Sequence, residues 1–228
     1  MRNQVQLIAY ADRLGGSLRG LGRLLDGPLA GLFGGVHVLP FFLPYDGADA
    51  GFDPVDHLAV DPRLGGWEDL AALGWSGTEG RSRDVVADLI VNHVSDRSAQ
   101  FIDVVERGER SPYAGMFLTY DRVFPTGATE ADLVRIVRPR PGLPFTPASL
   151  GGEQRLAWTT FTSSQIDLDV HHPAARRYLS EVLSRLAGCG VTMIRLERSR
   201  PCRPLAAGTS FKRLKGLEPS TFCMASRP

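Results

Sequence analysis

Short apolar runs alternate with amphipathic segments along the first half of the chain. Residues 5–9, 35–39 and 85–91 are the three apolar runs, which predict three strands, and the run at 35–39 is continuous enough for burial on both faces. Between the first two runs, leucines at positions 18, 21, 24 and 25 have the spacing of one helix face. Ser17 is a suitable cap and Gly27-Pro28 a suitable stop, so a helix is expected over residues 17–25.

The alternation of helix and strand resumes further along the chain. Helices are predicted over residues 67–73, 95–107 and 173–186, and a fourth strand over residues 191–196. Residues 40–64 are rich in turn-forming residues and are predicted as a loop. Because strand–helix–strand order favours right-handed crossovers, the four strands are expected to form a parallel sheet in an α/β fold.

The segment 112–165 interrupts this order. It is rich in Pro, Gly and Thr, and its stretch RPRPGLP at 138–144 predicts a stiff, extended backbone. A structureless loop of this length is unusual inside a compact domain. The sequence therefore favours an inserted subdomain after the third strand.

The last 31 residues differ from the rest in charge and in pattern. Residues 198–228 hold seven Lys or Arg and one acid, whereas residues 1–197 carry a net charge of −5. Neither a helix nor a strand period holds in this tail, so we expect an out-of-frame or disordered segment, with a basic arm as the functional alternative. The mildly acidic body argues against nucleic acid as a partner.

Composition otherwise indicates an ordinary globular protein. Of the 228 residues, 43% are hydrophobic and 22% are charged, which suffices for one sizeable core. Cys189, Cys202 and Cys223 are odd in number and lack a metal-binding spacing, so a reducing compartment such as the cytoplasm is expected. Neither a signal peptide nor an apolar run near the ~20 residues of a membrane span is predicted, and we expect no membrane partner.

Two strand ends carry the polar residues best placed for chemistry. The third strand runs into Asn92-His93, and the carboxyl ends of parallel barrel strands are where such folds hold their active sites. On the fourth strand, alternation puts Arg195 and Glu197 on one side, and an arginine keeps a neighbouring carboxylate ionised, as a glycosidic nucleophile requires. Taken alone, the more ordinary interpretations are a loop cap and a surface ion pair.

Longer motifs favour a functional interpretation of these residues over the loop cap and the surface ion pair. They are residues 3–15, 35–42, 46–54, 88–93, 138–145, 165–169 and 195–196. In these segments the chain resembles the sucrose phosphorylases of the α-amylase superfamily (glycoside hydrolase family 13). The strings ADAGFDP at 48–54 and RPRPGLPF at 138–145 are the most specific part of a resemblance that covers residues 1–197.

The resemblance implies the N-terminal half of a TIM-type (β/α)8 barrel with a small domain B inserted after strand three. Residues 1–111 then form the first part of the catalytic barrel, 112–165 domain B, 166–197 a barrel helix and strand four, and 198–228 a non-native or disordered tail. The implied reaction converts sucrose and inorganic phosphate to glucose 1-phosphate and fructose, with retention through a covalent glucosyl-enzyme. No cofactor or metal is implied, and a homodimer is implied for full-length members.

Site residues follow from the resemblance position by position. Asp49 and His93 are expected to bind hydroxyls of the glucosyl unit, between the apolar walls of Phe52 and Phe161. Gln165 is expected on the acceptor side, and Arg140 on phosphate, which suits a guanidinium fork. Arg195 is expected to orient the nucleophile, whose position is held by Glu197. The plainer alternatives are a turn residue for Asp49 and a core residue for Phe161.

The chain departs from the family pattern at Glu197, where the family has aspartate. The extra methylene displaces the carboxylate by roughly an ångström, and such a displacement can cost about 100-fold in rate. The general acid/base glutamate and the transition-state-stabilising aspartate belong after strands five and seven, beyond the four predicted strands. We therefore expect this chain by itself to be inactive and poorly soluble, because half a barrel also exposes strand edges.

Three alternatives to a sucrose phosphorylase remain open. One is a phosphorylase of another α-glucoside, such as glucosylglycerate, since Val137 stands where sucrose enzymes usually have tyrosine. The second is a non-catalytic, sugar-binding half-barrel that uses Asp49, Phe52 and His93. The third is an assembly in which a second polypeptide supplies the missing half.

Overall fold

Four parallel strands form the central sheet. In spatial order they are β1 (Gln6–Ala9), β2 (Gly35–Val38), β5 (Asp84–Ile90) and β10 (Met193–Glu197). The structure, a computed structural model, describes residues 4–47, 50–75, 83–136 and 138–197. Every neighbouring pair in this sheet is parallel, so the carboxyl ends of the four strands lie along one edge. The predicted parallel α/β sheet is confirmed.

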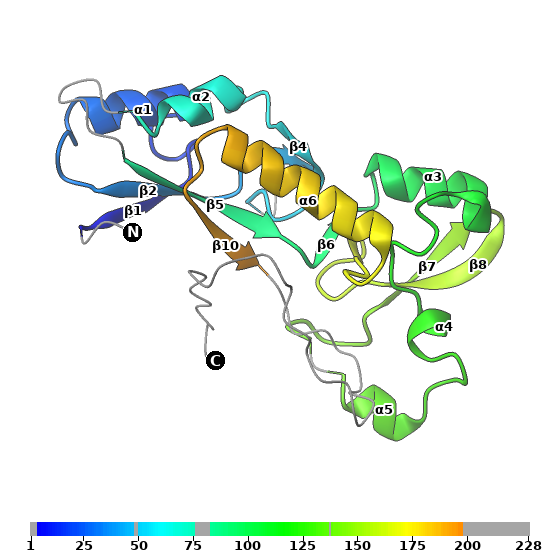
Figure 1. Ribbon diagram of the computed structural model, residues 1–228. Coiled ribbons are helices and arrows are strands. Elements are labelled where there is room, and N and C mark those ends of the chain that lie inside the picture. The colour runs from blue at the N-terminus through cyan, green and yellow to red at the C-terminus, as the bar shows by residue number, and fades with distance from the viewer. Residues whose placement is uncertain (1–3, 48–49, 76–82, 137, 198–228) are drawn as a thin grey trace.

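Three helices connect these strands. They are α1 (Leu18–Asp26), α2 (Trp67–Ala72) and α6 (Pro173–Gly188). The Ser17 hydroxyl accepts a hydrogen bond from the Gly20 N–H at 3.0 Å, which confirms the predicted cap of α1. In Figure 1, α1 and α2 lie side by side, and α6 runs along β5. Among the described residues, no helix has the length and apolar character needed to cross a bilayer.

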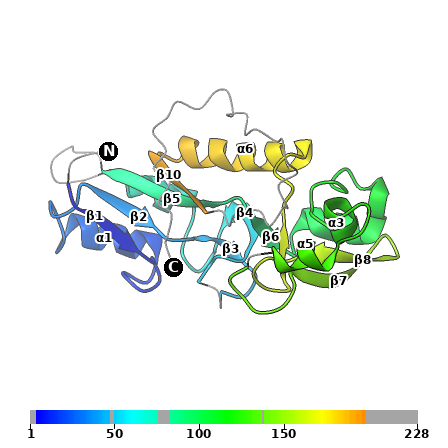
Figure 2. The same ribbon diagram turned by 90° about the horizontal axis from the view of Figure 1, so that it is seen from below.

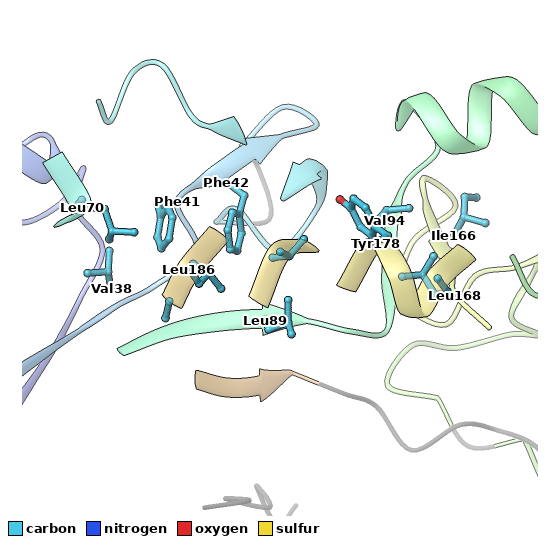
Figure 3. Packing of buried hydrophobic residues seen from close by; sticks show 14 of the residues in the cluster. Val38, Phe41, Phe42, Leu70, Leu89, Val94, Ile166, Leu168, Tyr178 and Leu186 are labelled. Carbon is cyan, nitrogen blue, oxygen red and sulfur yellow. The ribbon is translucent and has the colours of Figure 1, made fainter. Parts of the chain in front are cut away.

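One apolar core runs from the sheet to the base of the insertion. The residues labelled in Figure 3 are Val38, Leu70, Phe41, Phe42, Leu186, Leu89, Tyr178, Val94, Ile166 and Leu168. Helix α6 contributes both Tyr178 and Leu186 to this core, so it packs against the sheet at one end and against the insertion's base at the other. The Tyr178 hydroxyl also accepts a hydrogen bond from the buried His57 N–H at 3.1 Å.

The predicted loop at residues 40–64 is wrong in part, because it contains an antiparallel pair. This pair is β3 (Phe42–Pro44) with β4 (Pro54–Val60), and its register shifts twice. The prolines and the irregular register hide the strand pattern from a local analysis. Phe52 therefore lies on the connection between two paired strands, where its position is restrained from both sides.

The segment 112–165 folds as a hairpin with two short helices. The hairpin consists of β7 (Phe145–Leu150) and β8 (Glu153–Trp158), and the helices are α4 (Tyr120–Val123) and α5 (Glu130–Val134). Gly151 and Gly152, both at positive φ, form the two-residue turn that such hairpins favour. Figure 2 shows this segment at the end of the molecule opposite β1.

The predicted helix at 95–107 starts later than expected. Residues His93–Ser95 form strand β6, which pairs antiparallel with β9 (Gln165–Asp167). Helix α3 covers Ala99–Arg107, with Ser98 as its cap, and a 3-10 turn, η1 (Gly108–Arg110), follows. A pairing between residues about 70 positions apart leaves no local trace in the sequence, which explains the error.

Candidate functional site

A buried carboxylate joins three strands of the sheet. Asp88, on β5, is fully buried, and its Oδ1 lies 2.9 Å from Nε2 of His37 on β2. From β10, Arg195 places Nε 2.6 Å from Asp88 Oδ1 and donates from Nη2 to Oδ2 at 3.0 Å. This two-point contact consists of one charge-assisted hydrogen bond, from Nη2, and one close ion pair, at Nε, and together they set the orientation of Arg195.

Arg195 reaches from Asp88 toward Glu197. Its Nη2 lies 3.6 Å from Glu197 Oε2, which confirms that the two side chains share one side of β10. Their side chains are 38% and 42% exposed, whereas Asp88 is inaccessible to solvent. Glu197 is therefore a carboxylate at the end of a strand, open to solvent and adjacent to an arginine whose position a deeper carboxylate determines.

The backbone carbonyl of Phe52 links two other predicted site residues. His93 Nε2 lies 2.7 Å from this oxygen, and Gln165 Nε2 donates to it at 3.0 Å. Because a carbonyl oxygen only accepts, His93 carries a proton on Nε2. The Phe161 ring meets the His93 ring edge-on at 5.2 Å, and the Arg195 guanidinium carbon lies 6.0 Å from the Phe52 ring.

These contacts bring six predicted site residues into one constellation. They are Phe52, His93, Phe161, Gln165, Arg195 and Glu197. Asp49 and Val137 lie outside the described residues. Arg140 is described and exposed, and it sits on the segment between Arg138 and β7.

Arg138 is a functional candidate that the sequence analysis missed. It donates to the backbone oxygens of Leu143, Thr160 and Phe161 at 2.6, 3.1 and 3.1 Å. One side chain thus attaches the loop that carries Arg140 to the segment that carries Phe161. Arg138 is the first residue of the RPRPGLPF string, which marked this segment as specific to the family. The string does not show what Arg138 contacts, because a side chain that binds backbone oxygens leaves no pattern in the sequence.

Asp167, on β9, holds the same segment from the protein interior. Its buried carboxylate accepts hydrogen bonds from the Thr160 N–H at 3.0 Å and from the Thr160 hydroxyl at 2.5 Å. Burial raises the pKa of Asp167 from 3.8 to about 7, although hydrogen bonds from Thr160 and Asn92 and the charge of Arg138 act against this rise. The carboxyl group therefore titrates near neutral pH.

This pKa predicts a pH-dependent contribution to stability. A carboxyl group whose pKa is higher in the folded state than in the unfolded chain favours folding while it is protonated. The contribution of Asp167 is fully present below about pH 4 and is lost as the pH rises through about 7. Urea unfolding of the parent chain and of Asp167→Asn, between pH 4 and pH 8, should show the parent losing stability relative to the variant. Parallel profiles would contradict the shift.

No group of three or more His, Cys, Asp or Glu side chains in the described part of the chain has a metal-binding arrangement.

The side chain of Asn92 lies 3.4 Å from His93 Nδ1 and also hydrogen bonds to Asp167. Asn92 thus supports the two residues that frame the constellation. His93 keeps its donor directed at Phe52, and Asp167 keeps Thr160 in place.

Comparisons with known proteins show which family and which enzymes this chain resembles. A family model described as "Alpha amylase, catalytic domain" matches residues 15–200. A sucrose phosphorylase from Agrobacterium vitis is 52% identical over 215 residues, which make up 93% of this chain and 41% of that protein. A sucrose phosphorylase from Bifidobacterium adolescentis is 46% identical over 228 residues, 100% of this chain and 43% of that protein.

A solved structure agrees with these matches. The crystal structure of sucrose 6F-phosphate phosphorylase from Thermoanaerobacter thermosaccharolyticum superposes with a TM-score of 0.78 at 37% identity, over 86% of this chain and 40% of that one. The chain therefore spans about two fifths of the length of the relatives that it matches.

Proposed function

Because the chain belongs to the alpha-amylase family of catalytic domains, we propose that it supplies the glucosyl-binding part of a retaining phosphorylase that acts on sucrose. Its four parallel strands are the first strands of a (β/α)8 barrel. The observation that carries the proposal is the constellation at the carboxyl ends of β5 and β10, where Glu197, Arg195, Phe52, His93 and Phe161 form a continuous series of contacts. That edge is where barrels of this type perform catalysis.

In the proposed reaction, Glu197 stands at the position of the nucleophile. A Glu197 oxygen attacks C1 of the glucosyl unit, and the bond from C1 to the fructosyl oxygen breaks, with a proton delivered to fructose by a general acid. An oxygen of inorganic phosphate then attacks C1 and frees the carboxylate, so the product is glucose 1-phosphate with the original configuration. The general acid is proposed to come from barrel strands outside the four described here.

Arg195 and Asp88 prepare the carboxylate for this step. The two-point contact with Asp88 limits the rotamers of Arg195, and the guanidinium then faces Glu197 at 3.6 Å. A positive charge at this distance attracts a carboxylate oxygen and so favours one orientation of the Glu197 side chain. Arg195 thus acts as a positioning residue and as an electrostatic partner.

The glucosyl unit is proposed to lie between Phe52 and Phe161, with His93 as a hydrogen-bond donor to it and Gln165 as a donor on the acceptor side. In this structure both donors are directed at the Phe52 carbonyl. A sugar hydroxyl that binds His93 would accept the same proton, so binding requires the hydroxyl to share or replace that carbonyl. Asp49 is proposed to accept from the sugar, and Arg140 to bind phosphate from its exposed loop.

Residues 112–165 are proposed to act as domain B. The loop of Arg138 and Arg140 and the segment of Phe161 both belong to it, and both border the constellation. The proposed partners are sucrose, inorganic phosphate and glucose 1-phosphate, in a reducing compartment such as the cytoplasm. Phosphorolysis of glucosylglycerate instead of sucrose is the alternative, and it differs only on the acceptor side.

A chimaera tests the proposed function. Residues 1–197 would be joined to the part of the Agrobacterium vitis sucrose phosphorylase that follows the position aligned with residue 197, and purified protein would be given sucrose and inorganic phosphate. Release of glucose 1-phosphate by the chimaera, and no release by the 228-residue chain, is the expected result. A folded chimaera that phosphorolyses glucosylglycerate but not sucrose would favour the alternative, and one that binds glucose but reacts with neither substrate would favour a sugar-binding role.

A further inference from the structure

A small, arginine-lined cavity lies where α3 and η1 meet the proposed domain B, and it shares no lining residue with the constellation. It has a volume of about 210 Å³ and lies between η1, α4 and the β7–β8 hairpin. Figure 1 shows α3, which leads into η1, next to the hairpin, with α4 nearby. The charged side chains that line the cavity are Arg107, Arg110, Arg122, Arg155, Glu109 and Glu153.

Thr119 lines this cavity, and its buried hydroxyl has no hydrogen-bond partner among the described residues. Thr119 is 3% exposed, and its Oγ1 makes no hydrogen bond within the described part of the chain. The residue occupies the cap position of α4, yet its hydroxyl does not bond to the helix, as a threonine at that position usually does. A buried hydroxyl left in this state costs stability, and an oxygen atom of a ligand would satisfy it.

Two of the arginines are held by a carboxylate that a ligand can replace. Arg155 Nη1 lies 2.9 Å from Glu109 Oε1, and Arg122 Nη2 lies 3.3 Å from both oxygens of Glu109. Glu109 is therefore shared by two guanidinium groups, although its side chain is 61% exposed. Arg155 also pairs with Glu153 at 2.9 Å and with Asp121 at 3.5 Å, and both of these carboxylates are exposed as well. Ion pairs of such exposed groups contribute little free energy, so a dianion that enters the cavity can displace Glu109.

We propose that this cavity binds a phosphoryl oxyanion, either inorganic phosphate or the phosphoryl group of a sugar phosphate. Arg122 and Arg155 would each donate to its oxygens in place of Glu109, and the Thr119 hydroxyl would donate to a third oxygen. Guanidinium groups match the geometry of phosphate oxygens. The lining carries four arginines against two glutamates, and the volume is below the roughly 300 Å³ of sites for larger organic ligands, which favours a single small anion.

The test is a calorimetric titration of the purified, monodisperse 228-residue chain with inorganic phosphate at low ionic strength. One saturable site is expected. The double variant Arg122→Gln/Arg155→Gln is expected to bind phosphate at least about tenfold more weakly, because each arginine contributes a charge-assisted hydrogen bond. Thr119→Val, which keeps the shape of the side chain, is expected to weaken binding several-fold. Arg176→Gln, an exposed arginine of α6, is the control and should leave the affinity unchanged.

Glu109→Gln gives the decisive result, because it is expected to bind phosphate more tightly than the parent chain. Removal of the Glu109 charge frees the Arg122 guanidinium and takes away one of the three carboxylates that pair with Arg155, and a gain in affinity does not arise from misfolding. A parallel titration with glucose 1-phosphate identifies the source of the anion: equal affinity indicates that only the phosphoryl group is bound, and tighter binding indicates that the sugar contributes. Absence of saturable phosphate binding, or an affinity that neither Glu109→Gln nor the double variant changes, would overturn the proposal. The constellation is also proposed to take phosphate and glucose 1-phosphate, so the response to Glu109→Gln and to the double variant, neither of which alters the constellation, assigns the measured binding to this cavity.

Discussion

In the chimaera, replacement of Glu197 by aspartate is expected to raise the turnover number for glucose 1-phosphate release from sucrose by about 100-fold. The nucleophile must attack C1 along one line, and the side chains that set the sugar's position do not adjust to a longer carboxylate. Phe52, His93 and Gln165 are linked through one backbone carbonyl, and Phe161 packs on His93. A carboxylate about an ångström too far forward therefore meets the sugar at the wrong place.

Matched variants separate geometry from charge. Glu197→Gln keeps the length of the side chain but removes the nucleophilic oxygen, so the chimaera with glutamine should neither release fructose in the first half-reaction nor form glucose 1-phosphate in the second. Glu197→Asp restores the shorter reach, and its Michaelis constant for sucrose should change less than its turnover number, because the sugar contacts are the same. Equal or lower turnover with aspartate would show that this site has adapted to glutamate.

The position of Arg195 depends on Asp88 more than on Glu197. Its contacts with Asp88 are 2.6 and 3.0 Å, whereas its nearest approach to Glu197 is 3.6 Å. A change of length at residue 197 therefore leaves the arginine in place. This is the physical reason to expect that one substitution at position 197 changes the rate without unfolding the strand.

Local patterns predicted the elements that local interactions determine. The cap of α1 at Ser17, the apolar strands β1, β2 and β5, and the shared side of Arg195 and Glu197 all depend on residues a few positions apart. The β3–β4 and β6–β9 pairs depend on contacts that local periodicity does not record, so the first was predicted as loop and Ser95, the last residue of β6, as the start of a helix.

The candidate site was likewise predicted only in part. His93 and Gln165, which are proposed to touch substrate, belong to recognisable motifs and were predicted from them. The groups that hold those side chains were missed, because Arg138 binds backbone oxygens and Asp167 binds Thr160. Asp88 and His37 carried a signal, since each is a polar residue within an apolar strand, but only the fold shows that they meet.

Asp88→Ala is expected to lower the free energy of unfolding of the chain by about 3 kcal/mol. The substitution removes the only carboxylate that the described structure places between His37 and the two-point contact of Arg195, and it leaves both side chains without their buried partner. Loss of one member of a buried ion pair costs more than the pair itself contributes, because the remaining charge stays desolvated. Arg195 is 38% exposed, so water relieves part of this cost and the lower end of the usual range applies.

Urea unfolding at constant pH measures this effect, with two variants as references. Asp88→Asn keeps the volume and one acceptor, so its loss should fall between those of the parent and alanine. Glu153→Ala removes an exposed carboxylate, 71% accessible, from Arg155, and it should change the free energy of unfolding by less than about 0.5 kcal/mol. If Asp88→Ala were as mild as Glu153→Ala, Arg195 would not depend on Asp88, and the proposed orientation of the nucleophile would lose its structural basis.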